Sequence, residues 1–137
     1  MKGYLLDTNV LSELVRKRPS AAVLERIQGF PRKQLSTSSI CVTELRYGAA
    51  RHPQGGPLWA RITSEVLGGL RILPVAQAEA ERAGDLLAEL DLRGTPIGIE
   101  DVLIGATALV HGLVVATRNV RHFDRIEGLT VESWWET

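Results

Sequence analysis

Short apolar segments alternate with helical patterns along this chain, and this alternation constrains its fold more than any other feature. Each apolar segment ends at a polar cluster or a turn signal, as buried strands do. Strands are expected at 3–6, 35–38, 71–75, 113–117 and 129–132, and helices at 8–18, 20–29, 39–52, 58–67, 76–93 and 97–111, with a polar turn or short helix over 119–126. Because parallel strands need helical crossovers, the pattern predicts an α/β fold with a central, mostly parallel sheet of four to five strands and helices on both faces.

Length and composition exclude several classes of protein. With 137 residues, 45% of them hydrophobic, the chain is long enough for one domain with a buried core. Cys41 is the single cysteine, which excludes a disulfide framework, and three scattered histidines give no zinc-ligand spacing. The longest apolar run, 105–110, is too short to span a bilayer, and the start, 1–3, leads directly into a core-like segment instead of a signal peptide. We therefore expect a cytoplasmic protein without a membrane segment.

The formal charge is zero overall but uneven along the chain. Sixteen Lys and Arg residues meet sixteen Asp and Glu residues, yet residues 1–57 sum to +5 and residues 58–137 to −5. Such an asymmetry is one mark of a polyanionic partner, although solvated charged faces also produce it. The balanced total therefore does not exclude a nucleic acid partner.

Three acidic residues stand in apolar surroundings near the starts of helices. Asp7 follows the first buried strand, Glu44 lies at the edge of a buried helix face, and Asp101 opens the most apolar helix. Each has an ordinary alternative role, as a helix N-cap, a surface ion-pair partner and a first-turn acid, respectively. Because ligands bind at the carboxyl ends of strands in open α/β sheets, we expect these carboxylates to share one edge of the sheet.

Clustered carboxylates raise one another's pKa values, and a hard divalent cation removes that penalty. Mg²⁺ and Mn²⁺ suit carboxylate oxygens and water, and such a site activates water for attack on phosphorus. Thr117 and Asn119 follow a buried strand, and Thr8 and Asn9 follow Asp7. Their side chains are expected either to orient a bound water or to cap turns. The residues themselves therefore predict a divalent-metal site.

Four blocks of the chain resemble, in order and spacing, the PIN-domain ribonucleases, specifically the VapC-like and FitB-like toxins of bacterial toxin–antitoxin pairs. These blocks are Leu5–Leu14, Val42–Gly48, Pro96–Ala108 and Thr117–Trp134. The resemblance implies a single PIN-like domain over 1–137 with Mg²⁺- or Mn²⁺-dependent endoribonuclease activity. It implies metal ligands at Asp7, Glu44 and Asp101, with Thr117 and Asn119 as a polar pair near the metal. It also implies a homodimer and a small antitoxin whose C-terminal segment enters the active-site groove.

Two positions near these blocks have open roles. His122 stands directly before Phe123, where the family often has a fourth acid. A histidine there is expected to weaken metal binding, to contact an RNA phosphate, or to lie at the surface as an ordinary side chain. Glu13 matches the family's first block, and it is expected either to face the groove and hold an arginine or to be an ordinary exposed helix residue.

The function that follows is in-line hydrolysis of RNA phosphodiester bonds, which leaves 5′-phosphate and 3′-hydroxyl ends. Arginine outnumbers lysine thirteen to three, which suits a bidentate grip on phosphate, although genome base composition has the same effect. The candidates for holding the RNA backbone are Arg16, Lys17, Arg18, Arg46, Arg51, Arg118 and Arg121. With the three acids set aside, the rest of the chain sums to +3, which indicates a mildly basic surface around an acidic pocket.

Three other functions remain open from the sequence. An aspartate-based phosphatase also has an Asp after its first strand, but it wants a second Asp where Asn9 stands. A phospho-acceptor receiver domain wants a lysine late in the chain, whereas all three lysines of this chain lie within residues 2–33. A non-catalytic module that binds RNA or an antitoxin fits the incomplete set of acids.

Overall fold

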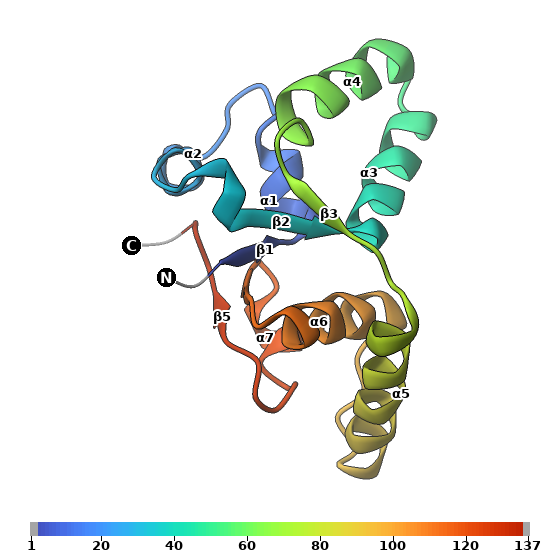
Figure 1. Ribbon diagram of the computed structural model, residues 1–137. Coiled ribbons are helices and arrows are strands. Elements are labelled where there is room, and N and C mark those ends of the chain that lie inside the picture. The colour runs from blue at the N-terminus through green and yellow to red at the C-terminus, as the bar shows by residue number, and fades with distance from the viewer. Residues whose placement is uncertain (1–2, 136–137) are drawn as a thin grey trace.

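The computed structural model describes residues 3–135, which form one five-stranded parallel sheet with helices on both sides (Figure 1). Met1 and Lys2, part of the start that argued against a signal peptide, lie outside the described residues. The strands are β1 (Tyr4–Leu6), β2 (Leu35–Ser38), β3 (Arg71–Leu73), β4 (Val114–Ala116) and β5 (Val131–Glu132). The α-helices are α1 (Thr8–Glu13), α2 (Ala21–Gln28), α3 (Ser39–Arg51), α4 (Gly55–Arg61), α5 (Gln77–Leu92), α6 (Ile99–His111) and α7 (Val120–Phe123). A 3₁₀ turn, η1 (Arg32–Gln34), and a π-helical segment, η2 (Ile62–Val66), complete the described elements.

The strand order is β3-β2-β1-β4-β5, and every neighbouring pair is parallel. From β1 the chain first moves outward through β2 and β3, and it then returns to the other side of β1 for β4 and β5. The order therefore reverses between β1 and β4. In open α/β sheets such a reversal opens a crevice beyond the carboxyl ends of the two strands, and this crevice is where ligands bind.

The predicted strands and helices are present, with differences at their ends. The helix expected over 58–67 begins at Gly55 and continues into η2. Pro57 lies in the first turn of α4, where a helix needs no N–H donor. The helix expected from residue 97 begins at Ile99, because Gly98 is its N-cap in extended conformation. None of the helices within residues 3–135 combines the length and apolarity that crossing a bilayer requires.

An aromatic cluster closes one side of the core. The ring centroid of Trp134 lies 5.2 Å from that of Tyr4 and 5.8 Å from that of Phe30, and the Tyr4 and Phe30 centroids are 4.8 Å apart. Trp134 is only 1% exposed, so its ring seals this edge of the core. The cluster thereby ties β1 to the segment after β5.

Candidate active site

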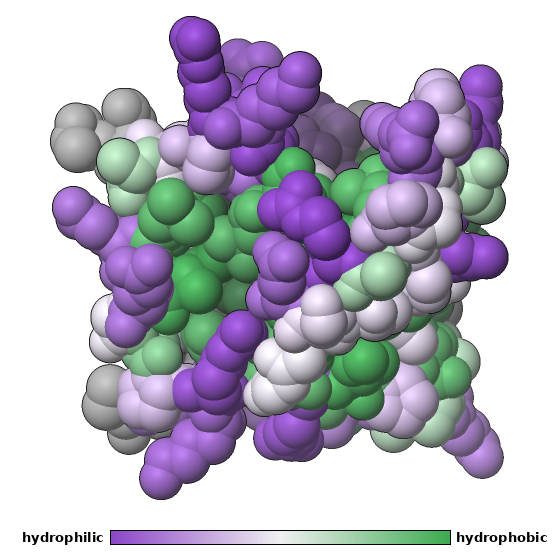
Figure 2. Space-filling model, turned by 90° about the horizontal axis from the view of Figure 1, so that it is seen from above, coloured by the Kyte–Doolittle hydropathy of each residue, from purple (hydrophilic) through white to green (hydrophobic). Residues whose placement is uncertain are grey.

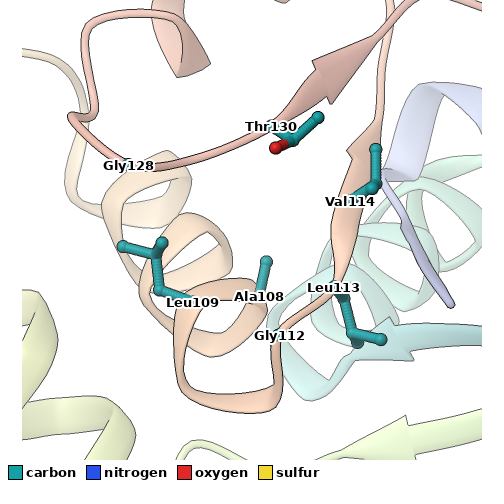
Figure 3. A pocket seen from close by; sticks show the side chains of 7 residues that line it. All are labelled: Ala108, Leu109, Gly112, Leu113, Val114, Gly128 and Thr130. Carbon is teal, nitrogen blue, oxygen red and sulfur yellow. The ribbon is translucent and has the colours of Figure 1, made fainter. Parts of the chain in front are cut away.

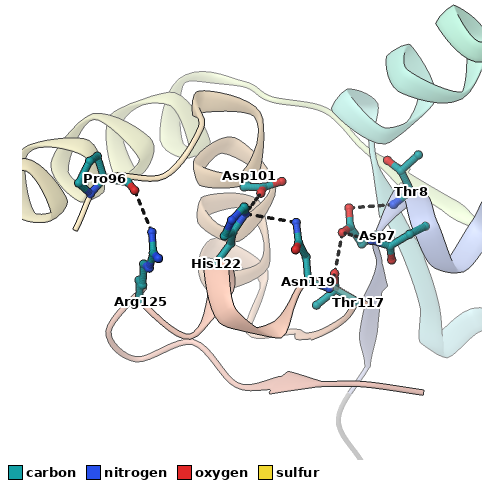
Figure 4. Close-up of polar contacts among 9 residues, drawn as sticks. Asp7, Thr8, Pro96, Asp101, Thr117, Asn119, His122 and Arg125 are labelled. Carbon is teal, nitrogen blue, oxygen red and sulfur yellow. Dashed lines mark hydrogen bonds and ion pairs between the residues drawn. The ribbon is translucent and has the colours of Figure 1, made fainter. Parts of the chain in front are cut away.

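The crevice between β1 and β4 brings Asp7 and Thr117 together. The strands are in register with Leu6 opposite Ala116, so the next residues, Asp7 and Thr117, emerge side by side. The backbone N–H of Asp7 donates to the carbonyl oxygen of Ala116 at 3.0 Å, and the Thr117 hydroxyl donates to Asp7 Oδ2 at 2.7 Å (Figure 4). The sheet itself therefore fixes the position of this carboxylate.

Asp7 is 4% exposed, yet donors surround its carboxylate. Oδ1 accepts from the backbone N–H of Thr8 at 2.8 Å, in the N-cap role that the sequence also allowed. Oδ2 accepts from the Asn9 amide at 3.3 Å in addition to Thr117. Burial raises the pKa of Asp7 to about 6, the hydrogen bonds from Thr117 and Thr8 oppose this shift, and the charges of Asp101 and Glu44 add to it. The carboxylate is therefore one that a cation would strongly favour in its ionised form.

A cleft of about 290 Å³ opens beside Asp7. Its lining residues are Asp7, Thr8, Asn9, Ser12, Glu44, Asp101 and Asn119. The three acids singled out in the sequence thus share one cleft, although they come from the start of α1, the middle of α3 and the first turn of α6. Within it, the Thr8 hydroxyl donates to Glu44 Oε1 and orients that carboxylate.

His122 lies at the cleft's edge through its contact with Asp101. Its Nδ1 is 3.1 Å from Asp101 Oδ2 and 3.2 Å from the side-chain amide nitrogen of Asn119 (Figure 4). The role of Nδ1 depends on the ring tautomer, because a protonated Nδ1 donates to Asp101 and an unprotonated Nδ1 accepts from the Asn119 amide. The side chain of His122 is 44% exposed, so the residue touches a site acid while part of its ring faces solvent.

Glu13 was expected at the groove or exposed on its helix, and it is in neither place. It is 4% exposed and is absent from the residues that line the cleft. Its Oε2 accepts from the backbone N–H of Ser20 at 2.7 Å, and its Oε1 lies 3.4 Å from the Arg16 guanidinium. Glu13 does hold an arginine of the same chain, but its buried carboxylate fixes the connection between α1 and α2.

Cys41 and Ser12 complete the surroundings of the site, and neither was identified as a site residue from the sequence. Ligand atoms of Asp7, Cys41 and Glu44 lie within 4.8 Å of one another. Burial raises the pKa of the Cys41 thiol to about 11, so it stays protonated, and it lies 3.9 Å from Asp7 Oδ1 as a weak donor. The donors left for a cation are carboxylate oxygens, the set that suits Mg²⁺ or Mn²⁺. The position of Ser12 one turn after Thr8 and Asn9 was the available signal for its place in the cleft.

A second hollow, of about 210 Å³, lies at the opposite edge of the sheet (Figure 3). Its lining residues are Ala108, Leu109, Gly112, Leu113, Val114, Gly128 and Thr130. They surround the end of α6 and the start of β4, and no titratable side chain is among them. This hollow therefore offers no group for acid–base or metal chemistry.

The raised pKa of Asp7 predicts a pH-dependent stability for the metal-free protein. A carboxyl group with a folded-state pKa of about 6 and an ordinary value of 3.8 stabilises the fold fully below pH 3.8, and this contribution is lost as the pH rises through 6. The difference corresponds to about 3 kcal/mol. The Asn variant also loses charge-assisted hydrogen bonds, which offsets part of this difference. We therefore expect the free energy of unfolding of metal-free Asp7→Asn to exceed that of the wild type by about 1–2 kcal/mol at about pH 8. Urea unfolding in EDTA at about pH 5 and pH 8 measures this, and an advantage that does not shrink at the lower pH would contradict it.

Comparison with known proteins adds sequence and structural relatives. Residues 4–129 match the PIN domain family. The VapC ribonuclease Y4jK of Sinorhizobium fredii is 39% identical, over 96% of this chain and 97% of that protein. The tRNA(fMet)-specific endonuclease VapC of Shigella flexneri is 33% identical, over 98% and 99%.

Solved structures agree with these sequence relatives. FitAcB from Neisseria gonorrhoeae superposes with a TM-score of 0.91 at 31% identity, covering 98% of this chain and 99% of that chain. A chain of a toxin–antitoxin complex from Klebsiella pneumoniae gives a TM-score of 0.74 at 27% identity, covering 98% and 100%. With its cleft of acids at the sheet's crevice and relatives that match it from end to end, this chain belongs to the PIN-domain family, among its VapC-like and FitB-like members.

Proposed function

We propose that this chain is a Mg²⁺- or Mn²⁺-dependent endoribonuclease toxin that a cognate antitoxin neutralises. The observation that carries the proposal is the convergence of Asp7, Glu44 and Asp101 on one cleft at the carboxyl ends of β1 and β4. The names of the VapC relatives, a ribonuclease and a tRNA-specific endonuclease, support this assignment. We further propose that residues 1–137 form a single PIN-like domain and that it acts in the cytoplasm, since its proposed substrate is RNA.

In the proposed mechanism, Asp7 and Asp101 would hold the cation directly, and Glu44 would hold it directly or through water. A bound Mg²⁺ or Mn²⁺ supplies neutralising charge at the scissile phosphate and lowers the pKa of a water. Thr117 fixes one oxygen of Asp7, and Thr8 orients Glu44. Asn119 lines the cleft within reach of bound water or substrate. In-line attack then leaves 5′-phosphate and 3′-hydroxyl ends.

The basic side chains near the cleft differ in whether they contact other side chains of the protein. Arg16 lies 3.4 Å from Glu13, and the Arg46 guanidinium lies 5.1 Å from the centroid of Trp59. Arg118 and Arg121 are exposed beside the residues that follow β4. We propose that the RNA backbone passes these last two residues, because they lie within two positions of Asn119, which lines the cleft.

We also propose that the chain forms a homodimer. Tyr47 and Ile99 are 60% and 54% exposed, and hydrophobic side chains also reach the surface on the face that Figure 2 shows. A hollow of about 450 Å³ adjoins the catalytic cleft, with Glu44 in both, and its lining residues are Ile40, Thr43, Glu44, Tyr47 and Glu100. Exposed apolar side chains around a hollow suit a protein–protein contact. Light scattering of the purified protein tests this state directly.

The antitoxin proposal rests on the relatives. One structural neighbour is named as a toxin–antitoxin complex, and the match covers 98% of this chain and 100% of the neighbour's matched chain. Co-expression with the product of a small adjoining reading frame, followed by co-purification and loss of cleavage, tests the partnership. The structure does not support the phosphatase alternative, which requires a second Asp where Asn9 stands. The Asn9 side chain instead donates to Asp7 and accepts from the backbone N–H of Arg118.

Metal binding by the acids predicts a cation-dependent melting temperature. At a free Mn²⁺ concentration about 100-fold above its Kd, a ligand that binds only the folded state stabilises it by about 2.7 kcal/mol. For a chain of this size we expect a rise in Tm of about 8–10 °C. Asp101→Asn should abolish most of this rise, whereas Asp124→Asn, an exposed acid outside the cleft, should retain it. Equal shifts in all three proteins would place the cation elsewhere.

A further inference from the structure

We propose that Arg118 binds the RNA phosphate next to the scissile one, and that Trp135 is a positioning residue that holds Arg118 ready for this contact. The inference rests on the proposed ribonuclease function and adds to it a specific phosphate-binding pair. Arg118 and Trp135 follow two neighbouring strands, β4 and β5.

Both residues lie beyond the same edge of the sheet as the acids. β4 and β5 are parallel, with Ala116 opposite Glu132, and the backbone N–H of Thr117 donates to the Glu132 carbonyl oxygen at 3.0 Å. Arg118 follows Ala116 by two positions and Trp135 follows Glu132 by three. The guanidinium carbon of Arg118 lies 5.1 Å from the centroid of the Trp135 ring, within the range of a cation–π contact.

The backbone of Arg118 is tied directly to the cleft. Its N–H donates to Asn9 Oδ1 at 3.0 Å, while the amide of Asn9 donates to Asp7 Oδ2 at 3.3 Å. Its chain neighbours are Thr117, bonded to Asp7, and Asn119, which lines the cleft. The side chain of Asn9 thus bridges the Arg118 backbone and Asp7, the proposed metal ligand. This bridge holds Arg118 close to the proposed reaction centre.

The Trp135 ring is a firm support for the arginine. It is partly buried and packs against the hydrophobic core, and its indole nitrogen is buried without an acceptor among residues 3–135. A packed ring that stacks on a guanidinium restricts the arginine's rotamers and leaves its N–H groups at the edge free for a planar, bidentate grip on phosphate.

A neighbouring pair shows the contrasting arrangement. Arg26 lies 5.2 Å from the Trp134 ring centroid, but it also donates to Glu132 at 2.8 Å, so its charge is already matched. Among residues 3–135, Arg118 has no carboxylate within ion-pair distance. Its side chain is exposed at the rim of an acidic cleft. The Arg26 pair is therefore structural, whereas the charge of Arg118 is available for a phosphate.

The test measures binding of a fluorescein-labelled single-stranded RNA oligonucleotide by anisotropy, with every variant made in an Asp101→Asn background to prevent cleavage. We expect Arg118→Ala to weaken binding about tenfold and to reduce the slope of log Kd against log salt by about 0.7. Trp135→Ala should weaken binding about three- to fivefold, and Trp135→Phe should restore most of the loss. Arg82→Ala, which removes an exposed charge on α5, serves as the matched control and should leave Kd within about twofold.

A double substitution separates positioning from direct contact. Trp135→Ala should have no further effect in an Arg118→Ala protein, because the ring acts only through the arginine. An undiminished effect in that background would mean that the ring stacks on a base itself, and it would overturn the proposal. Arg118→Ala behaving like Arg82→Ala would overturn it as well. Cleavage of RNA by the wild type is measured separately. An inactive wild type would refute the proposed ribonuclease function. An active wild type whose RNA affinity does not change in Arg118→Ala would refute only the proposed roles of Arg118 and Trp135.

Discussion

Asp7→Asn should lower the rate of RNA cleavage at least about a thousandfold while the protein stays folded. That factor corresponds to about 4 kcal/mol of transition-state stabilisation. The change removes one negative charge at the centre of the acid cluster and replaces one of the two carboxylate oxygens with an amide nitrogen. The surrounding donors, Thr117 and Thr8, bind Asp7 through neutral groups that do not supply the missing charge.

The experiment is a cleavage assay on total RNA with Mg²⁺ or Mn²⁺, with sequencing of the new ends. The cleavage rate of Asp101→Asn should fall by a comparable factor. Asp124 is exposed and lies one residue beyond α7, so Asp124→Asn should cleave at the wild-type rate. Cleavage that persists in both cleft variants would refute the assigned metal site. Stoichiometric RNA binding with no turnover in the wild type would favour a non-catalytic module instead.

Trp134→Ala should destabilise the fold by about 3–5 kcal/mol, a large share of the stability of a domain of this size. The ring is buried at 1% exposure, and its removal leaves Tyr4 and Phe30 facing a cavity. It also removes the stacking partner of Arg26 and the indole donor to Glu132 at 3.2 Å. The loss therefore combines a cavity, two ring contacts and a hydrogen bond.

Urea denaturation followed by circular dichroism measures this loss. Trp59→Ala is the matched control. Trp59, on α4, is only partly buried, and its ring contacts the guanidinium of Arg46 on α3. We expect it to cost about 1–2 kcal/mol. If the two substitutions cost the same, the cluster around Trp134 does not close the core as described.

Asp7 and Asp101 could be found from the sequence because each one interrupts an apolar pattern, whereas Glu44, at the edge of a buried helix face, stood out through the family resemblance of its block. A carboxylate that follows a buried strand, such as Asp7, or opens an apolar helix, such as Asp101, is costly unless something compensates for its charge. The alternation of strands and helices likewise gave the parallel sheet, since local periodicity reflects which faces are buried. These features depend on residues close together in the chain, so they can be recognised in a single sequence.

The strand order and the role of Glu13 could not be predicted in this way. Which strands flank β1 depends on the paths of the crossovers, and no periodicity within a segment records that choice. Glu13 was expected to face the groove or to be exposed on its helix, but its carboxylate accepts from the backbone N–H of Ser20, seven positions on, where the loop after α1 turns back. No sequence pattern places Cys41 at the site, because its contact with Asp7 arises from packing between elements.

The hydrogen bond between Thr117 and Asp7 joins residues 110 positions apart. Closing so long a loop costs entropy, and the bond exists only when β1 and β4 lie side by side. No fragment of the chain, and no partly opened state that releases β4, keeps the cleft in its working shape. Cleavage activity should therefore report on the cooperativity of the whole sheet, and it should disappear at the denaturant concentration where the last strands separate.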